Sequence, residues 1–282
     1  MYEYSKSIKS SLSDELINSY VLRPLANIVV RILYRSRITP NQVTVASIFA
    51  GFMAAFAYLK NNPMAIACAG LLVTIKDVLD SADGQLARAK QLYSRSGRFL
   101  DSIADYIVDV ALFAAIGWVL TSRHESINYG FLALIGLVGI TFRVSYHVFY
   151  QASYLHLQRV YETNRITEEL SEEDKMGDPL TLRLQRIFQV IYGWQDRLVL
   201  RIDGWCKGVE TNEGFQQAWY SDVWALRLSG FMGMGTELFL LTACSLLDRL
   251  ELYLFINAVV MNVLLLVNIL YRRLVLREKL ST

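Results

Sequence analysis

Hydrophobic residues gather in six long runs that are separated by more polar stretches. Each run is close to the roughly 20 residues that an α-helix needs to cross a bilayer. The six runs cover residues 43–59, 64–79, 100–120, 129–150, 228–247 and 252–271. This pattern predicts an all-α, polytopic membrane protein with six transmembrane helices in a membrane domain over residues 43–271.

Before the first run, residues 1–42 are expected to form a cytoplasmic region that ends in an amphipathic helix. Apolar residues recur at helical spacing from Leu16 to Leu33. The opposite face carries four polar or basic residues, namely Arg23, Asn27, Arg31 and Arg35. Such a helix is typical of one that lies in the membrane interface, although a soluble helix covering a core has the same pattern. Pro24 should kink the helix or restart it.

Composition and charge agree with a membrane protein and give it an orientation. The chain is 54% hydrophobic and 19% charged, and its net charge of +2 gives no reason to expect nucleic acid as a partner. Basic residues gather before residue 38, in the loop after the second run and in the tail over residues 272–282. The positive-inside rule makes these segments cytoplasmic, so both termini are predicted on that side.

Residues 151–226 interrupt the pattern, because they are too many for a tight connection and too polar to span a membrane. An acidic stretch over residues 168–175 precedes a helical period that returns from Leu180 to Leu198. We expect a cytoplasmic helical insertion. It could cover an active site, contact a partner or stabilise the fold, and we favour the third role.

The residues that suggest chemistry lie between Asp80 and Asp109. Asp80 and Asp83 are three residues apart and Asp101 and Asp105 are four apart, so each pair shares one face of a helix. Two such pairs facing each other could supply four carboxylates to hard cations, which prefer oxygen ligands. Mg²⁺ or Mn²⁺ suits this set better than Zn²⁺, since no His or Cys is near. The alternative is two solvated acidic helix ends, which the apolar flanks and the cost of intramembrane carboxylates disfavour.

Small residues and one arginine accompany the carboxylates. Gly84 and Ala87 lie on or beside the face of the first pair, and Gly97 lies one turn before Asp101. Small side chains leave space where backbone and ligand approach closely. Arg88 adds an always-charged, planar guanidinium that suits a phosphate.

The string D-x2-D-G-x2-A-R-x8-G-x3-D-x3-D resembles the signature of the CDP-alcohol phosphotransferase family. Its eight fixed positions all match, at Asp80, Asp83, Gly84, Ala87, Arg88, Gly97, Asp101 and Asp105. The turn at residues 39–44, T-P-N-Q-V-T, is similar to one that precedes the first membrane helix in this family. There Asn41 either faces the nucleotide or, like Thr39, caps the helix. The insertion over residues 151–226 lies outside the resemblance.

The resemblance implies an integral membrane enzyme of phospholipid synthesis with its active site on the cytoplasmic side. An alcohol acceptor attacks a CDP-linked donor, with CDP-diacylglycerol preferred, and CMP leaves. Two Mg²⁺ or Mn²⁺ ions held by the four motif aspartates would clamp the pyrophosphate, and Asp105 would also accept the hydroxyl proton. The nucleotide and diphosphate would contact Asp80, Gly84, Ala87, Arg88, Gly97 and Asn41. Membrane lipid surrounds such an enzyme, and a homodimer stays open.

Several alternatives remain at this point. The segment from Gly97 to Asp109 resembles members that use inositol-phosphate-like or serine acceptors. It departs from the LDPxADK form of the glycerophosphate branch, since Ser102 and Tyr106 replace Pro and Lys. A CDP-amino-alcohol donor with a diacylglycerol acceptor stays open. A member that has lost catalysis is a third possibility, which the intact set of aspartates disfavours. A divalent-cation transporter would explain the carboxylates but not Arg88 or the small residues.

Four outer positions have two interpretations each. Asp77 and Asp109 lie one turn outside the motif and either support the metal ligands or have a structural polar role. Lys76 and Arg143 are cations inside apolar runs, where a partner or substrate is expected. Arg143 binds an acceptor phosphate or extends to the cytoplasmic edge. His147, one turn further, is more often a packed polar residue than a base.

Overall fold

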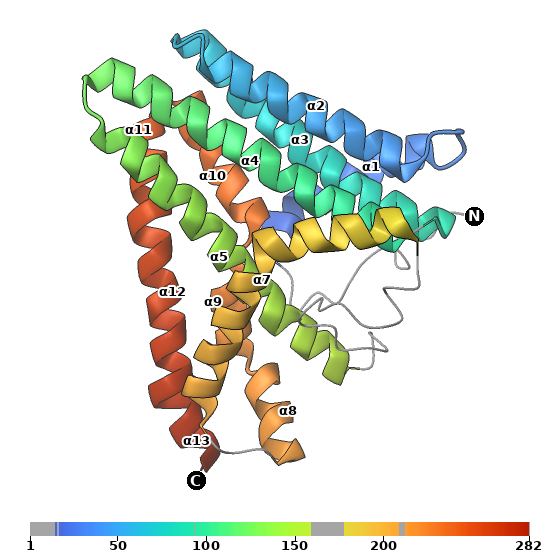
Figure 1. Cartoon of the computed structure of the whole chain (residues 1–282), viewed down its shortest axis with the longest axis vertical. Helices are drawn as coiled ribbons and strands as arrows, with labels where there is room; N and C mark the ends of the chain where they lie inside the picture. Colours follow the sequence, from blue (N-terminus) through green and yellow to red (C-terminus); the bar gives the residue numbers. More distant parts are fainter. Residues whose placement is uncertain (1–14, 16, 93, 159–177, 209–211, 282) are drawn as a thin grey trace.

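The structure is a computed structural model that describes residues 15, 17–92, 94–158, 178–208 and 212–281 (Figure 1). All regular structure in these residues is helical, which confirms the all-α prediction. The acidic stretch at 168–175 lies outside the described residues.

Four long helices form the first part of the fold. They are α2 (Pro40–Tyr58), α3 (Pro63–Lys90), α4 (Arg95–His124) and α5 (Asn128–Leu157). Helix α2 packs against both α3 and α4, and α5 packs on α4 (Figure 1). A short loop after Lys90 joins α3 to α4, and the chain reverses direction there. The end of α3 and the start of α4 therefore bring the two halves of the aspartate motif to the same end of the bundle.

Side-chain caps set where these helices begin. Thr39 and Gln42 form a reciprocal capping box at the start of α2, with the Thr39 backbone N–H donating to Gln42 Oε1 at 2.9 Å. Thr39 is therefore the cap, and Asn41 is not. Asn62 accepts from the backbone N–H of the third residue of α3, and Ser94 accepts from Gly97 N at 3.0 Å at the start of α4.

The second part of the fold begins within residues 151–226, the segment expected to be an insertion. It consists of α7 (Pro179–Lys207), α8 (Glu213–Ser221), α9 (Val223–Gly230), α10 (Met234–Leu246) and one continuous helix over residues 250–281. That last helix runs through α11 (Leu250–Phe255), η3 (Ile256–Val260), α12 (Met261–Leu270), η4 (Tyr271–Leu276) and α13 (Arg277–Ser281). The residues expected to form a basic tail thus continue the helix.

The fifth apolar run is broken into α9 and α10. Gly230 and Gly233 flank the break, and glycine is a poor helix former. Gly233 is extended at the N-cap of α10, and Glu15 Oε2 accepts from the Thr236 backbone N–H at 3.3 Å. The carboxylate of a distant segment thereby satisfies the start of α10, where negative charge is favourable.

Within the described residues, four helical segments are long and apolar enough to cross a membrane: Pro40–Tyr58, Arg95–His124, Asn128–Leu157 and Leu250–Leu280. The shorter helix α10 is apolar but has only 13 residues. In α3 the motif aspartates and Lys76 add charge to an otherwise apolar helix. Four of the six expected spans are supported by length and composition, while spans at α3 and α10 stay predictions.

The N-terminal helix begins as η2 (Asn18–Leu22) and continues as α1 (Arg23–Leu33). Pro24 lies in the first turn of α1, where the helix changes from π to α, as expected for a restart. Ala26 and Val30 pack on the buried part of α3, whereas Ile28 and Ile32 are 56% and 72% exposed. An apolar row facing outward suits a helix in the membrane interface, which stays a prediction.

Candidate active site

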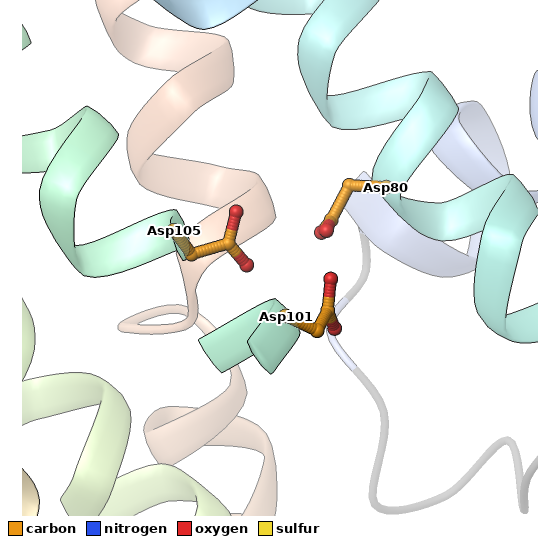
Figure 2. A group of neighbouring side chains, drawn as sticks. All are labelled: Asp80, Asp101 and Asp105. Atoms are coloured by element: carbon orange, nitrogen blue, oxygen red, sulfur yellow. The ribbon is translucent and has the colours of Figure 1, made fainter. Parts of the chain in front are cut away.

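Three carboxylates converge where α3 faces the start of α4. Asp80 projects from α3, and Asp101 and Asp105 project from successive turns of α4 (Figure 2). One oxygen from each lies within 4.8 Å of the others, and all three side chains are partly buried. The four-residue spacing on α4 thus places both of its aspartates toward the same point, as predicted.

Asp83 lies beside this cluster rather than in it. It is 5% exposed, and its Oδ2 accepts a hydrogen bond of 2.5 Å from the Thr44 hydroxyl on α2. The spacing of Asp80 and Asp83 predicted that both would face the second pair. Because three residues are 300° of helix rotation and not a full turn, Asp83 is turned toward α2.

The carboxylates fit a divalent cation. Asp101 Oδ1 is buried and has no hydrogen-bond partner among the described residues. A buried acceptor without a partner calls for an explanation, and a bound ion is one. Three carboxylates this close also repel each other unless positive charge lies between them. An all-oxygen donor set suits Mg²⁺ or Mn²⁺.

Lys76 supplies one positive charge to the carboxylate cluster from within the protein. It lies one turn before Asp80, is 1% exposed, and places Nζ 2.5 Å from Asp105 Oδ1. Asp77 and Asp109 are also buried, and Asp109 Oδ1 has no hydrogen-bond partner among the described residues. The two cations inside apolar runs therefore behave differently, because Lys76 belongs to the cluster and Arg143 does not.

Arg143 is fully buried among protein partners. Its Nε donates to Glu237 Oε1 at 3.0 Å, its Nη2 also contacts that oxygen, and its Nη1 donates to Asn262 Oδ1 at 2.7 Å. Asn257 Nδ2 donates to the second Glu237 oxygen. Extension to a water-exposed edge is therefore wrong for Arg143, and its recorded contacts give no support to phosphate binding. His147 is buried and lies 3.2 Å from the Ser229 hydroxyl, as a packed polar residue would.

The small residues of the motif lie beside the carboxylates. Asp80, Gly84 and Ala87 share one stripe of α3 by their four- and three-residue spacing. A Cβ on Gly84 would lie 3.5 Å from the Arg88 guanidinium, so Arg88 extends back along this stripe. On the other side of the loop, a Cβ on Gly97 would lie 3.5 Å from Asn41 Oδ1. Asn41 is therefore next to the second half of the motif.

Sequence reasoning missed two contacts. Thr44 is the last residue of the turn that suggested a role for Asn41, so the same turn could have indicated Thr44 as well. Its hydroxyl donates to Asp83. Tyr192 on α7 donates to the Ser102 backbone carbonyl at 2.9 Å, inside the aspartate motif. Nothing in local spacing could have indicated that contact, because 90 residues separate the partners.

Comparison with known proteins gives the fold and the motif a family. The model of the family described as CDP-alcohol phosphatidyltransferase matches residues 37–203, more than half of the chain. The chain belongs to this family. The match runs from the turn before α2 into α7, so the expectation that the insertion lies wholly outside the resemblance is wrong. Membership also speaks against a cation transporter.

Several curated relatives share part of the chain. A bifunctional IPC transferase and DIPP synthase of Thermococcus kodakarensis is 34% identical over 126 residues, which are 45% of this chain and 27% of that protein. An archaetidylinositol phosphate synthase of Pyrococcus horikoshii is 33% identical over 115 residues, 39% of this chain and 53% of that protein. A phosphatidylinositol phosphate synthase of Corynebacterium glutamicum is 30% identical over 106 residues, which are 38% of this chain and 46% of that protein. The chain thus spans between about a quarter and about half of these relatives' lengths.

Proposed function

We propose that the protein transfers a substituted phosphate group from CDP-diacylglycerol to an alcohol hydroxyl and releases CMP, in phospholipid synthesis. The observation that carries this proposal is the convergence of Asp80, Asp101 and Asp105 within 4.8 Å, in a chain whose family match covers all three. The family's donors are CDP-linked, and the named relatives are phospholipid-type synthases.

The reaction balances as a displacement at phosphorus. The acceptor oxygen forms a bond to the lipid-linked phosphorus, the bond from that phosphorus to the CMP oxygen breaks, and its electron pair leaves with CMP. The hydroxyl proton goes to a base. Asp105 suits this role, because Lys76 contacts only its Oδ1, so the two oxygens can divide between a metal ion and the hydroxyl proton.

Asp80, Asp101 and Asp105 would hold Mg²⁺ or Mn²⁺, with Asp83 as the fourth ligand of a pair of ions. When bound, these ions supply the positive charge that offsets the negative charge developing on the departing phosphate. Thr44 donates to one oxygen of Asp83, which orients this carboxylate and leaves its other oxygen for the site. We further propose that Asp77 and Asp109, which are both buried, support Lys76 and the ligands.

The donor would lie along the small-residue stripe. Arg88 donates to a donor phosphate, and Gly84 and Ala87 leave the nucleotide room to approach α3. Gly97 and Asn41 close the opposite side, where the Asn41 amide can hydrogen bond to the nucleotide.

For the acceptor we infer inositol phosphate as the first candidate. Two relatives, 33% and 30% identical, are by their names an archaetidylinositol phosphate synthase and a phosphatidylinositol phosphate synthase.

Incubation of the detergent-purified chain with labelled CDP-diacylglycerol tests this function. The acceptor panel contains inositol phosphate, inositol, serine and glycerol phosphate, and CMP release and lipid products are measured with and without Mg²⁺ or Mn²⁺. We expect metal-dependent CMP release with one acceptor and none with Asp101→Asn. Asp248→Asn, at the other end of the bundle in a partly exposed ion pair with Arg123, should keep wild-type activity. Product from CDP-choline and diacylglycerol instead would refute the donor assignment.

The active site is proposed to face the cytoplasm, with both termini on that side. The support is the lysine and arginine bias of the segments flanking the motif. Single cysteines placed at residues 61–63 and 248–251, in a chain without its own three cysteines, should react with a membrane-impermeant reagent only from the opposite side. Labelling from the cytoplasmic side would contradict this topology.

A further inference from the structure

Helix α7 crosses α4 at the aspartate motif. Its Tyr192 hydroxyl donates to the Ser102 carbonyl oxygen at 2.9 Å, and Ser102 directly follows Asp101. Figure 1 shows α7 lying against the first turns of α4, the part that carries Asp101 and Asp105. The contact therefore acts on the backbone between two of the three converging carboxylates.

Aromatic rings surround this hydrogen bond. Phe188 lies 5.3 Å from the Phe99 ring and 4.8 Å from the Tyr192 ring, and Tyr106 meets Tyr192 edge-on at 6.1 Å. Phe99, Ser102 and Tyr106 form one stripe of α4 by their three- and four-residue spacing, beside the stripe of Asp101 and Asp105. Paired rings of this kind add stability and fix geometry. The α7 contact thus helps to fix the rotation of α4 about its axis.

Helix α7 is itself held by α5. Gln195 Oε1 accepts from the Ser145 hydroxyl at 2.7 Å, and Asp203 Oδ1 accepts from the Tyr150 hydroxyl at 3.0 Å. Three contacts spaced along α7, at residues 192, 195 and 203, join it to two neighbours. A helix anchored at several points transmits little movement, so it can restrain α4.

Such a restraint has a clear physical purpose. Asp80 on α3 and the two aspartates of α4 repel one another before a cation binds, and this repulsion tends to push α4 away from α3. A site loses affinity when its ligands are misplaced, and a shift near 1 Å can cost about 10²-fold in rate. A fixed contact on the neighbouring flank of α4 limits that displacement.

We propose that Tyr192 is a positioning residue, through which α7 holds Asp101 and Asp105 at the distance from Asp80 that a divalent cation requires. This inference deepens the proposed function and rests on it for the meaning of the metal site. It gives the insertion a role at the active site in addition to its role in the fold.

The test compares two conservative variants that each remove one hydrogen-bonded tyrosine hydroxyl, partly buried at Tyr192 and buried at Tyr146. Tyr192→Phe deletes the bond to Ser102. Tyr146→Phe deletes a bond of 2.8 Å to Asn268 Oδ1 and leaves the motif untouched. Mn²⁺ affinity is measured on the metal alone, without substrate, together with thermal unfolding of the metal-free protein and the kcat and KM for CDP-diacylglycerol.

We expect both variants to lower the unfolding temperature by a similar few degrees, but only Tyr192→Phe to weaken Mn²⁺ binding, by roughly 10-fold. Its kcat should fall by about the same factor, with the donor KM near that of wild type. Phe188→Leu keeps the Tyr192 hydroxyl but removes the aromatic ring that packs on Tyr192. It should therefore weaken Mn²⁺ binding by less than Tyr192→Phe does.

Wild-type Mn²⁺ affinity in Tyr192→Phe would overturn the proposal, as would an equal loss in Tyr146→Phe. The Mn²⁺ measurement needs no turnover, so it separates this inference from the reaction. A wild-type chain that binds Mn²⁺ but does not release CMP refutes the proposed function alone. A wild-type chain that binds no Mn²⁺ refutes both.

Discussion

Two buried acidic sites in this molecule differ in how their carboxylates are satisfied. Asp203 on α7 is 3% exposed and accepts from Tyr150 Oη at 3.0 Å, Trp219 Nε1 at 2.9 Å and Tyr220 Oη at 2.9 Å, and it pairs with Lys207 at 3.1 Å. The aspartates of α3 and α4 instead face one another, and Asp101 Oδ1 has no hydrogen-bond partner in the described part of the chain.

The difference separates a structural carboxylate from one that is built to bind a ligand. Four donors hold Asp203 and join α5, α7 and α8, and burial raises the pKa of Tyr220, which therefore stays a neutral donor. Leaving buried acceptors unsatisfied costs stability, and proteins keep such groups where function requires them. Substitutions at the two sites can test this contrast.

The largest effect is expected at Asp105. Asp105→Asn should keep donor binding but lower turnover by about 10²–10⁴, because an amide cannot accept the hydroxyl proton at neutral pH. Asp83→Asn should instead weaken metal and donor binding together, since a charged ligand is lost. Donor binding and single-turnover CMP release across a metal titration distinguish the two variants.

Recovery of the wild-type rate in Asp105→Asn at high metal concentration would make Asp105 a ligand and not the base. Partial overlap between the two variants is expected, because groups that share a metal act as a unit.

Lys76→Met comes next and probes the charge inside the cluster. Removing one partner of a buried ion pair leaves Asp105 uncompensated, so the metal-free protein should lose about 3 kcal/mol of unfolding free energy. Mg²⁺ should then raise the unfolding temperature more than it does in wild type. Lys76→Arg keeps the charge and serves as the control. An unchanged Mg²⁺ response in Lys76→Met would show that Lys76 does not offset the cluster's charge.

Asp203→Asn tests the satisfied site. Replacing the charged acceptor should cost about 2 kcal/mol of unfolding free energy, because hydrogen bonds to a charged group are lost and an amide N–H₂ faces other donors. Mn²⁺ affinity measured at a temperature where the protein is folded should stay at the wild-type value. A weaker Mn²⁺ affinity at equal folding would contradict the separation of the two sites.

The smallest effect is expected at the start of α7. Asp178 accepts from the Thr181 backbone N–H and hydroxyl, both at 3.0 Å, and these bonds hold the pKa of its carboxyl below its usual range. A lowered pKa stabilises the folded state above the ordinary pKa, and this contribution disappears as pH falls through the lowered value. Asp178→Ala should speed amide exchange in the first turn of α7 at neutral pH. Wild type and variant should converge in acid, and divergence there would refute the cap.

Local spacing determined much of what the sequence revealed. The aspartate pairs, the small residues between them and the apolar runs follow helix periodicity, which depends on neighbours within about two turns. From these alone came the all-α fold, four supported spans, the helix that begins after Asp178, and the convergence of Asp80 with Asp101 and Asp105.

Long-range packing decided the rest. Thr44 turns Asp83 toward α2, Glu237 takes up Arg143, and Tyr192 reaches the motif across 90 residues. The Glu15 carboxylate likewise meets the start of α10 from the far end of the chain. Each contact joins helices that no sequence period relates, because periodicity gives the face of a helix but not the helix that faces it.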